Sequence, residues 1–156
     1  MKILLIIIFI TVLGAFSYFF FLGYKSQTGY ARGLVDSKLS RCPASPNCIS
    51  SEYPEDKLHF TEPLDISDYK FEKLSQAIID AINNTGGKPA SIEKNYISAT
   101  YTSNIFRYVD DFEIRIDSNS NLLHIRSASR VGHSDLGANL KRIQQFKNQF
   151  KSSKLL

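Results

Sequence analysis

Several residue types and motifs are scarce or missing in this chain of 156 residues. Two cysteines and three histidines do not supply four zinc ligands at the usual spacing. No G-x-S-x-G sequence is present, so the nucleophile elbow of an α/β-hydrolase is missing. There is no internal repeat, and no basic face interleaved with aromatic residues of the kind that binds nucleic acid. We therefore expect no metal, no cofactor and no nucleic-acid partner.

Charge is missing from the beginning of the chain. Between Ile3 and Leu22, 17 of 20 residues are apolar. Twenty helical residues span about 30 Å, the thickness of the hydrocarbon core of a bilayer. The run ends in aromatic residues with no small-x-small triplet directly after it, which favours an uncleaved signal anchor over a cleaved signal peptide. We predict a single transmembrane helix over 1–23 that contacts membrane lipid through residues 3–22.

Acidic residues are missing from the end of the chain. Residues 136–156 hold five basic residues and no acid, whereas residues 23–135 hold 13 basic and 15 acidic residues. The net charge of +4 is therefore a basic end on a nearly neutral body. We expect a solvated basic tail over 152–156, and contact with anionic lipid headgroups is the alternative.

The two cysteines, Cys42 and Cys48, are six residues apart, and Pro43 and Pro46 bend the chain between them. A disulfide here would close a short loop and stabilise the fold by about 2.4 kcal/mol. Structural disulfides persist outside the cytosol. We therefore predict a Cys42–Cys48 disulfide in a domain on the extracytoplasmic side of the membrane, periplasmic or lumenal. Two free thiols are the alternative.

Two helical patterns follow in the remaining sequence. Residues 24–41 have no hydrophobic period and are expected to form a linker, followed by a single domain over 42–151. The first helix is predicted to begin near Asp65 or Ser67. Its apolar face consists of residues three or four positions apart: Phe71, Leu74, Ile78 and Ile82. The second helix is predicted to begin at Ser134-Asp135, with the apolar stripe Leu136, Leu140, Ile143, Phe146 and Phe150.

Between these helices the pattern changes to strands. One hairpin is predicted over 88–103, turning at Lys94-Asn95, and another turns at residues 118–121. If 117 pairs with 122, opposed residue numbers sum to 239, so that apolar residues meet on one face and Glu113 meets Arg126 on the solvated face. The fold class is therefore α+β. We expect about four antiparallel strands with two helices packed on one face, preceded by the transmembrane helix.

Asp110 does not fit this pattern, because the same register places it on the apolar face opposite Ser129. A buried carboxylate must be hydrogen-bonded, paired or protonated. Three explanations stay open. A β-bulge could turn Asp110 outward, it could be a structural acceptor, or it could line a ligand pocket.

Polar residues are also concentrated in the segment 126–135, which passes through Gly132 into a helix N-terminus. Arg126, Arg130 and Ser134 form a candidate site for a phosphate or carboxylate, with Asp110 and Ser129 nearby. A cap neutralised internally by Asp135 is the alternative. Asp110, His133 and Ser134 have the residue types of a hydrolase triad, but their spacing carries no catalytic signature, so we expect no catalytic residue.

Three ordered motifs resemble those of the domain-of-unknown-function family 1499, over roughly residues 42–146. They are Cys42-Pro-Ala-Ser-Pro-Asn-Cys48, Arg107-Tyr-Val-Asp-Asp-Phe-Glu113, and Ile125 to Asn139 with Arg142. The resemblance implies a module often found behind an export signal or a membrane anchor, and it implies no particular activity.

These observations predict a membrane-anchored extracytoplasmic module without enzymatic activity. We expect it to bind a membrane-protein partner or to be an accessory subunit of a membrane complex. The alternative is an extracytoplasmic hydrolase, or a protein that binds a small anion through Asp110, Arg126, Arg130 and Ser134.

Overall fold

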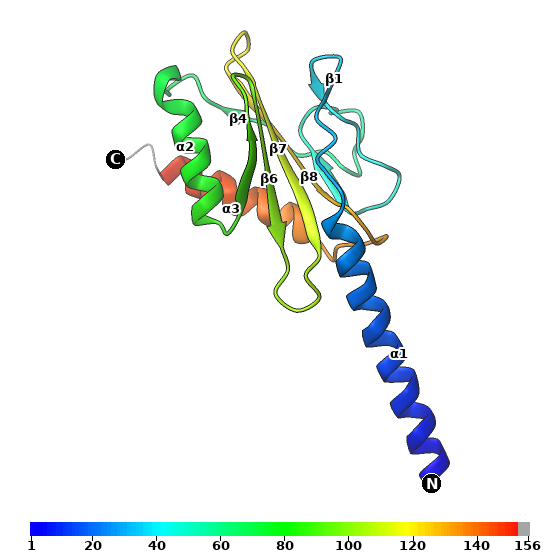
Figure 1. Cartoon of the computed structure of the whole chain (residues 1–156). Helices are drawn as coiled ribbons and strands as arrows, with labels where there is room; N and C mark the ends of the chain where they lie inside the picture. Colours follow the sequence, from blue (N-terminus) through cyan, green and yellow to red (C-terminus); the bar gives the residue numbers. More distant parts are fainter. Residues whose placement is uncertain (153–156) are drawn as a thin grey trace.

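The computed structural model of the chain describes residues 1–152 (Figure 1). The predicted basic tail, 152–156, lies outside the described residues except for Ser152. The elements, in chain order, are α1 (Lys2–Gln27), β1 (Leu34–Val35), β2 (Lys38–Leu39), β3 (Cys48–Ser50), β4 (Leu64–Asp65), α2 (Phe71–Asn84), β5 (Lys88–Ile92), β6 (Tyr96–Thr102), β7 (Val109–Asp117), β8 (Leu122–Ser129) and α3 (Ala138–Ser152).

The main sheet is antiparallel and has six strands, so the α+β class is confirmed but the predicted number of four strands is wrong. The strand order is β3-β8-β7-β6-β5, and β4 also pairs with β8. The strands missed from the sequence, β3 and β4, have three and two residues and lie in a proline-containing segment. Strands this short do not display the alternating pattern by which β5 to β8 were found.

The predicted register of the β7–β8 hairpin is confirmed along its whole length. Ile114 pairs with Ile125, Glu113 with Arg126, and Asp110 with Ser129. The β5–β6 hairpin also turns where it was predicted, between Ile92 and Tyr96.

Helices α2 and α3 cover one face of the sheet, as predicted. Their buried residues form one cluster with the apolar residues of β6, β7 and β8, in which Ile78, Ile114 and Phe146 have no exposed surface. Fully burying side chains of this size contributes about 1.5–3 kcal/mol each. This cluster is the hydrophobic core of the protein.

The opposite face of the sheet is also covered, so the prediction of a solvated face is wrong. Glu113 is 0% exposed and Arg126 is 2% exposed. The segment between α1 and β3, expected to be a linker, lies over them and carries the β1–β2 hairpin, in which Leu39 is fully buried. Figure 1 shows this segment, in blue to cyan, on the side of the sheet away from α2.

Both helices of the domain begin later than predicted. Asp65 belongs to β4 and its Oδ1 accepts a hydrogen bond from Ser67 N, so α2 begins only at Phe71, which is 46% exposed. The α3 helix begins at Ala138, and Leu136, predicted in its apolar stripe, is 97% exposed. The reason is a turn before the helix, in which Leu136 has a φ of 53°.

The N-terminal helix α1 projects from one end of the domain (Figure 1). It has 26 residues, and its most apolar window of 18 residues has a mean hydropathy of 2.7 and is not buried by the rest of the chain. By length and composition it can cross a membrane, either as an anchor or as a signal sequence.

Candidate functional site

A cavity that includes several of the candidate residues lies where α1 meets the domain. It is open, has a volume of about 900 Å³, and is bordered by α1, the β6–β7 loop, the β8–α3 loop and the first turns of α3. We call it the α1 pocket. Its wall on α1 consists of Tyr18, Phe19 and Leu22, and the residues facing it from the domain include Asp110 and Ser134. An apolar wall on α1 and a mixed wall with polar and apolar residues therefore face one cavity.

Helix α1 is fixed against the sheet by close backbone contacts. Gly23 is buried, and a Cβ at this position would lie 1.7 Å from the backbone oxygen of Phe106. Ser26 Oγ accepts a hydrogen bond from Val109 N (2.9 Å), and Ser26 O accepts one from Arg130 Nη1 (3.1 Å). Glycine at position 23 is thus required for the helix to approach the β6–β7 loop.

Aromatic rings extend this contact along α1. The ring of Phe106 lies 6.0 Å from that of Phe16 and 5.3 Å from those of Phe19 and Phe20, measured between centroids. Aromatic pairs at such separations stabilise by about 0.5–1.5 kcal/mol beyond the area that they bury. Phe19 and Phe106, which line the α1 pocket, are consequently part of a packed aromatic cluster.

Asp110 lies at the base of the α1 pocket. The β7–β8 ladder is continuous through Asp110, so no bulge turns it outward. Its Oδ2 accepts a hydrogen bond from Arg142 Nη2 of α3 at 2.8 Å, and both side chains are 13% exposed. Asp110 is thus a structural acceptor, for Arg142, and it also lines a cavity, so that a role in binding a ligand stays a prediction.

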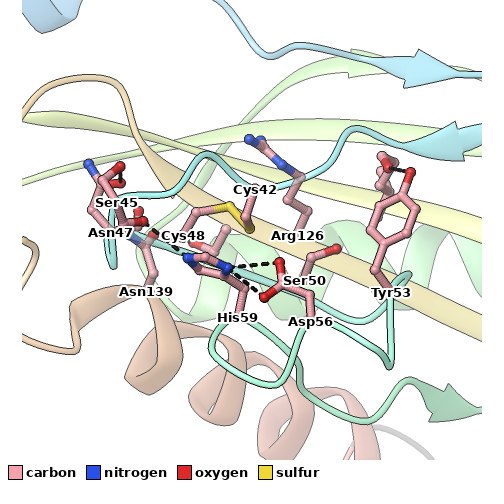
Figure 2. The surroundings of a disulfide bond; sticks show 12 residues. Cys42, Ser45, Asn47, Cys48, Ser50, Tyr53, Asp56, His59, Arg126 and Asn139 are labelled. Carbon is pink, nitrogen blue, oxygen red and sulfur yellow. Dashed lines mark hydrogen bonds and ion pairs between the residues drawn. A yellow bond between two sulfur atoms is a disulfide. The ribbon is translucent and has the colours of Figure 1, made fainter. Parts of the chain in front are cut away.

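Asn139 connects the base of the pocket to the disulfide loop. Its Nδ2 donates to Asn47 O (2.9 Å) and to Ser129 Oγ (3.1 Å), and its Oδ1 accepts from Ser127 Oγ (2.6 Å). Asn139 is fully buried, so each of these hydrogen bonds stabilises a polar group that water cannot reach. Figure 2 shows Asn47 and Asn139 beside the disulfide.

The predicted disulfide between Cys42 and Cys48 is present, with the two Cα atoms 5.6 Å apart (Figure 2). His59 lies next to this loop. Its Nδ1 is 2.8 Å from Asp56 Oδ2 and its Nε2 is 3.2 Å from Ser45 O. Because both ring nitrogens face oxygen acceptors, His59 holds the disulfide loop in place and has no nitrogen directed to a cavity.

Arg126 and Arg130 lie on the other face of the sheet, away from the α1 pocket. They line a smaller cavity of about 310 Å³ together with Arg32 and Asp111, which we call the arginine pocket. Arg130 donates to Asp111 through Nε (3.0 Å) and Nη2 (2.7 Å). Among the described residues, Arg126 Nε is the one buried side-chain nitrogen or oxygen without a hydrogen-bond partner.

The residues predicted to form one anion site are therefore divided between two cavities. Asp110 and Ser134 line the α1 pocket, Arg126 and Arg130 line the arginine pocket, and Ser129 borders both. The division follows from the alternation of side chains across a strand, since Arg126 and Ser129 are an odd number of residues apart.

Buried hydrogen bonds perturb two tyrosines of β6. Burial raises the pKa of Tyr96 above the usual value, and so does the Glu113 carboxylate, which accepts a hydrogen bond of 2.9 Å from the Tyr96 hydroxyl. Burial also raises the pKa of Tyr101, whose hydroxyl lies 2.7 Å from Thr85 Oγ1 and whose ring faces Arg142. Both phenols are therefore neutral at physiological pH.

The hydrolase triad considered from the sequence is not connected. Asp110, His133 and Ser134 all line the α1 pocket, but Asp110 is held by Arg142, and Ser134 Oγ accepts from Leu136 N (3.3 Å). No hydrogen bond within residues 1–152 joins His133 to Asp110 or Ser134. In the same residues, no three His, Cys, Asp or Glu side chains are placed to hold a metal ion.

The cap at the start of α3 is neutralised internally. Asp135 Oδ1 accepts from Gly137 N (3.1 Å) and Oδ2 accepts from Asn139 N (2.7 Å). The carboxylate thus occupies the N–H groups that an anion would need. Lys141, one turn further along, lines the α1 pocket with its side chain exposed.

Sequence reasoning missed the part that α1 and the β6–β7 loop play in the site. The membrane helix was treated as an anchor only, although Gly23 and Ser26 at its end were visible small residues. Lys141 was counted with the basic end of the chain. Its position opposite α1 depends on the tertiary fold, for which the sequence carries no local signal.

A comparison with known protein families identifies the family of this chain. A family model described as "Protein of unknown function (DUF1499)" matches residues 38–150, which include the disulfide, the whole sheet and nearly all of α3. No curated protein matches the chain. The match covers well over half of the sequence and agrees with the motifs around Cys42, Asp110 and Arg126. The chain therefore belongs to the DUF1499 family.

Proposed function

We propose that this protein is a membrane-anchored module that binds an anionic amphiphile in the α1 pocket. The observation that carries the proposal is the composition of that cavity. One wall is formed by aromatic and aliphatic residues of a membrane-type helix, and the wall from the folded domain adds charged and polar residues, among them Asp110, Ser134 and Lys141, to further apolar ones. A ligand with an apolar tail and a polar head matches both walls.

Retention of α1 in the mature protein is part of the proposal. Buried Gly23, the Ser26–Val109 hydrogen bond and the aromatic packing of Phe106 are contacts that removal of the helix would eliminate. Cleaved signal peptides have no need of such fitted contacts with the mature domain. The packing therefore supports a single-pass anchor.

The charge of the pocket indicates the sign of the ligand. Arg142 forms an ion pair with Asp110, and the Asp135 carboxylate accepts hydrogen bonds from two backbone N–H groups. Lys141 has no acidic partner within ion-pair distance in the described part of the chain. Lys141 is therefore the cation of the pocket that is available to a ligand, and a phosphate or carboxylate headgroup is the group that it would attract.

We infer that the domain lies on the extracytoplasmic side. The support for this is the Cys42–Cys48 disulfide, because structural disulfides persist in oxidising compartments. In this arrangement the α1 pocket opens at the outer surface of the membrane.

The experiment compares two photo-crosslinkable lipids with the same acyl chains, phosphatidate and diacylglycerol, added to the full chain in nanodiscs. We expect phosphatidate to crosslink to the β8–α3 loop or to α3, and diacylglycerol to do so less. Lys141→Ala should weaken phosphatidate labelling about fivefold, which corresponds to about 1 kcal/mol for one lysine near a membrane surface.

Lys151→Ala is the matched control, because Lys151 is an exposed lysine of the same helix that does not line the α1 pocket. It should leave the labelling unchanged. Equal labelling by the two lipids, or equal effects of the two substitutions, would show that the pocket does not select an anionic amphiphile.

A further inference from the structure

The β6–β7 loop, residues 103–108, lies beside the apolar run of α1. Figure 1 shows the loop at the same end of the domain as α1. The contacts of Phe106 with Phe16, Phe19 and Phe20 define its height along the helix. With a rise of 1.5 Å per residue, these rings lie about 3–9 Å before Leu22, where the apolar run ends. The tip of the loop is thus level with the interior of the apolar run.

Apolar side chains at this end of the domain are left uncovered. Ile105, next to Phe106 in the loop, is 69% exposed, and Leu136, which borders the α1 pocket, is 97% exposed. A single exposed leucine or isoleucine is common on soluble proteins. Here both lie on the part of the domain that adjoins a membrane-type helix.

The height of the loop is fixed by the contacts at the end of α1. The fit of Gly23 against Phe106 O and the Ser26–Val109 hydrogen bond attach both the loop and the start of β7 to the helix. A bilayer that contains the apolar run of α1 therefore meets the loop at a set depth.

We propose that the β6–β7 loop is inserted into the membrane interface beside α1, with Ile105 and Phe106 among the acyl chains. A depth of about 5–10 Å is typical of interfacial segments, and it agrees with the level of Phe106 on the helix. Arg107 and Tyr108 follow in sequence, and residues of this kind place a polar end in the headgroup region while their apolar part is buried. Through this loop the domain contacts the surface of the bilayer directly.

This inference rests on the placement of α1 in a bilayer, but it does not depend on which amphiphile binds in the α1 pocket. The chain contains no tryptophan, so one introduced tryptophan reports on one position. Three variants of the full chain are compared in phosphatidylcholine–phosphatidylglycerol nanodiscs: Ile105→Trp in the loop, Leu13→Trp in the middle of α1, and Ile92→Trp at the end of β5, which pairs with the end of β6 that is remote from the loop.

Lipids brominated at different depths quench tryptophan fluorescence. We expect Ile105→Trp to emit at shorter wavelength than Ile92→Trp and to be quenched most by bromine near the headgroup. Leu13→Trp should be quenched most by bromine deep in the chains, and Ile92→Trp should not be quenched. Ile92 is the matched control, because it is also an exposed isoleucine, at 56%.

Two results would overturn the inference, and they differ in what they say about the proposed function. If Leu13→Trp is quenched and Ile105→Trp behaves like Ile92→Trp, α1 is an anchor and the loop stays outside the bilayer. If Leu13→Trp is not quenched, α1 is not in the membrane, and the anchor fails together with the seating of the loop.

Discussion

The carboxylate of Glu113 has no exposed surface and accepts hydrogen bonds from three parts of the chain. The donors are Gly33 N (2.8 Å), the Tyr96 hydroxyl (2.9 Å) and Arg126 Nη1. Removal of one partner from a buried ion pair costs about 3–5 kcal/mol, because the other charge stays buried and unpaired. At the residue scale, these buried charges fasten the N-terminal segment to the sheet.

Tyr96→Phe tests this cluster through pH. At neutral pH we expect the free energy of unfolding to fall by about 1.5–3 kcal/mol, the usual contribution of a hydrogen bond to a charged group. Burial and Glu113 raise the pKa of Tyr96 in the folded protein. The unfolded chain therefore loses the phenolic proton first, and stability decreases as the pH rises above about 10, the ordinary tyrosine value.

Urea unfolding of the full chain between pH 7 and 11 measures this dependence. The variant should lose less stability above pH 10 than the wild type does. Tyr30→Phe is the control, since Tyr30 is 83% exposed, and it should resemble the wild type at each pH. Parallel curves for wild type and Tyr96→Phe would contradict the assignment.

At the scale of elements, the contact between α1 and the β6–β7 loop can be tested with Gly23→Val. A side chain at position 23 would collide with the backbone oxygen of Phe106, so the helix must separate from the loop. We expect faster amide hydrogen exchange at Val109, whose N–H donates to Ser26 Oγ, and throughout residues 104–109.

Gly14→Val is the matched control for this experiment. Gly14 lies in the same helix, and a Cβ there would have no atom within 4 Å. Its exchange pattern in nanodiscs should equal that of the wild type. Equal exchange in the two glycine variants would mean that α1 is not docked on the loop.

The success of the sequence predictions also varies from element to element. The β7–β8 register was predictable because two strands of nine and eight residues alternate between apolar and polar positions. The helix boundaries were not. Asp65 has the residue type of a cap but accepts its hydrogen bond in a turn that precedes α2, and Asp135 caps α3 through Asn139 N from a turn that comes before the helix. Leu136 was assigned to a helix that begins only two residues later.

The covering of the charged face could not be predicted from a pattern. The segment after α1 is held largely through its backbone, by Gly33 N on Glu113 and by Leu39 N on Glu52. Backbone donors are the same for nearly every residue type, so they leave no period in the sequence. The candidate anion site was predicted as one cluster because its residues are close together in the sequence, whereas Arg126 and Ser134 line different cavities.

At the scale of the whole molecule, the disulfide relates the fold to its compartment. Replacing both cysteines, Cys42→Ser with Cys48→Ser, should lower the free energy of unfolding by about 2.4 kcal/mol, the chain-entropy cost of opening so short a loop. Dithiothreitol should destabilise the wild type by a similar amount and leave the double variant unchanged. Chemical denaturation with and without the reductant measures both effects.

The proposed extracytoplasmic location is supported by the same bond. Alkylation of the protein in its own membrane, followed by mass spectrometry, should find no modified cysteine before reduction and two after it. Two thiols modified without reduction would remove the support for an extracytoplasmic domain.

The direct junction between α1 and the sheet also limits where the protein can act. Gly23 packs on the β6–β7 loop and Ser26 on the start of β7, so no flexible linker separates the helix from the domain. If α1 spans a membrane as we propose, the domain is held against the lipid surface, and a macromolecule that contacts the domain has to come within one domain height of the lipid. Any rotation of the helix about its own axis would turn the mouth of the cavity by the same angle, so helix-to-helix association in the membrane would decide in which lateral direction that mouth opens.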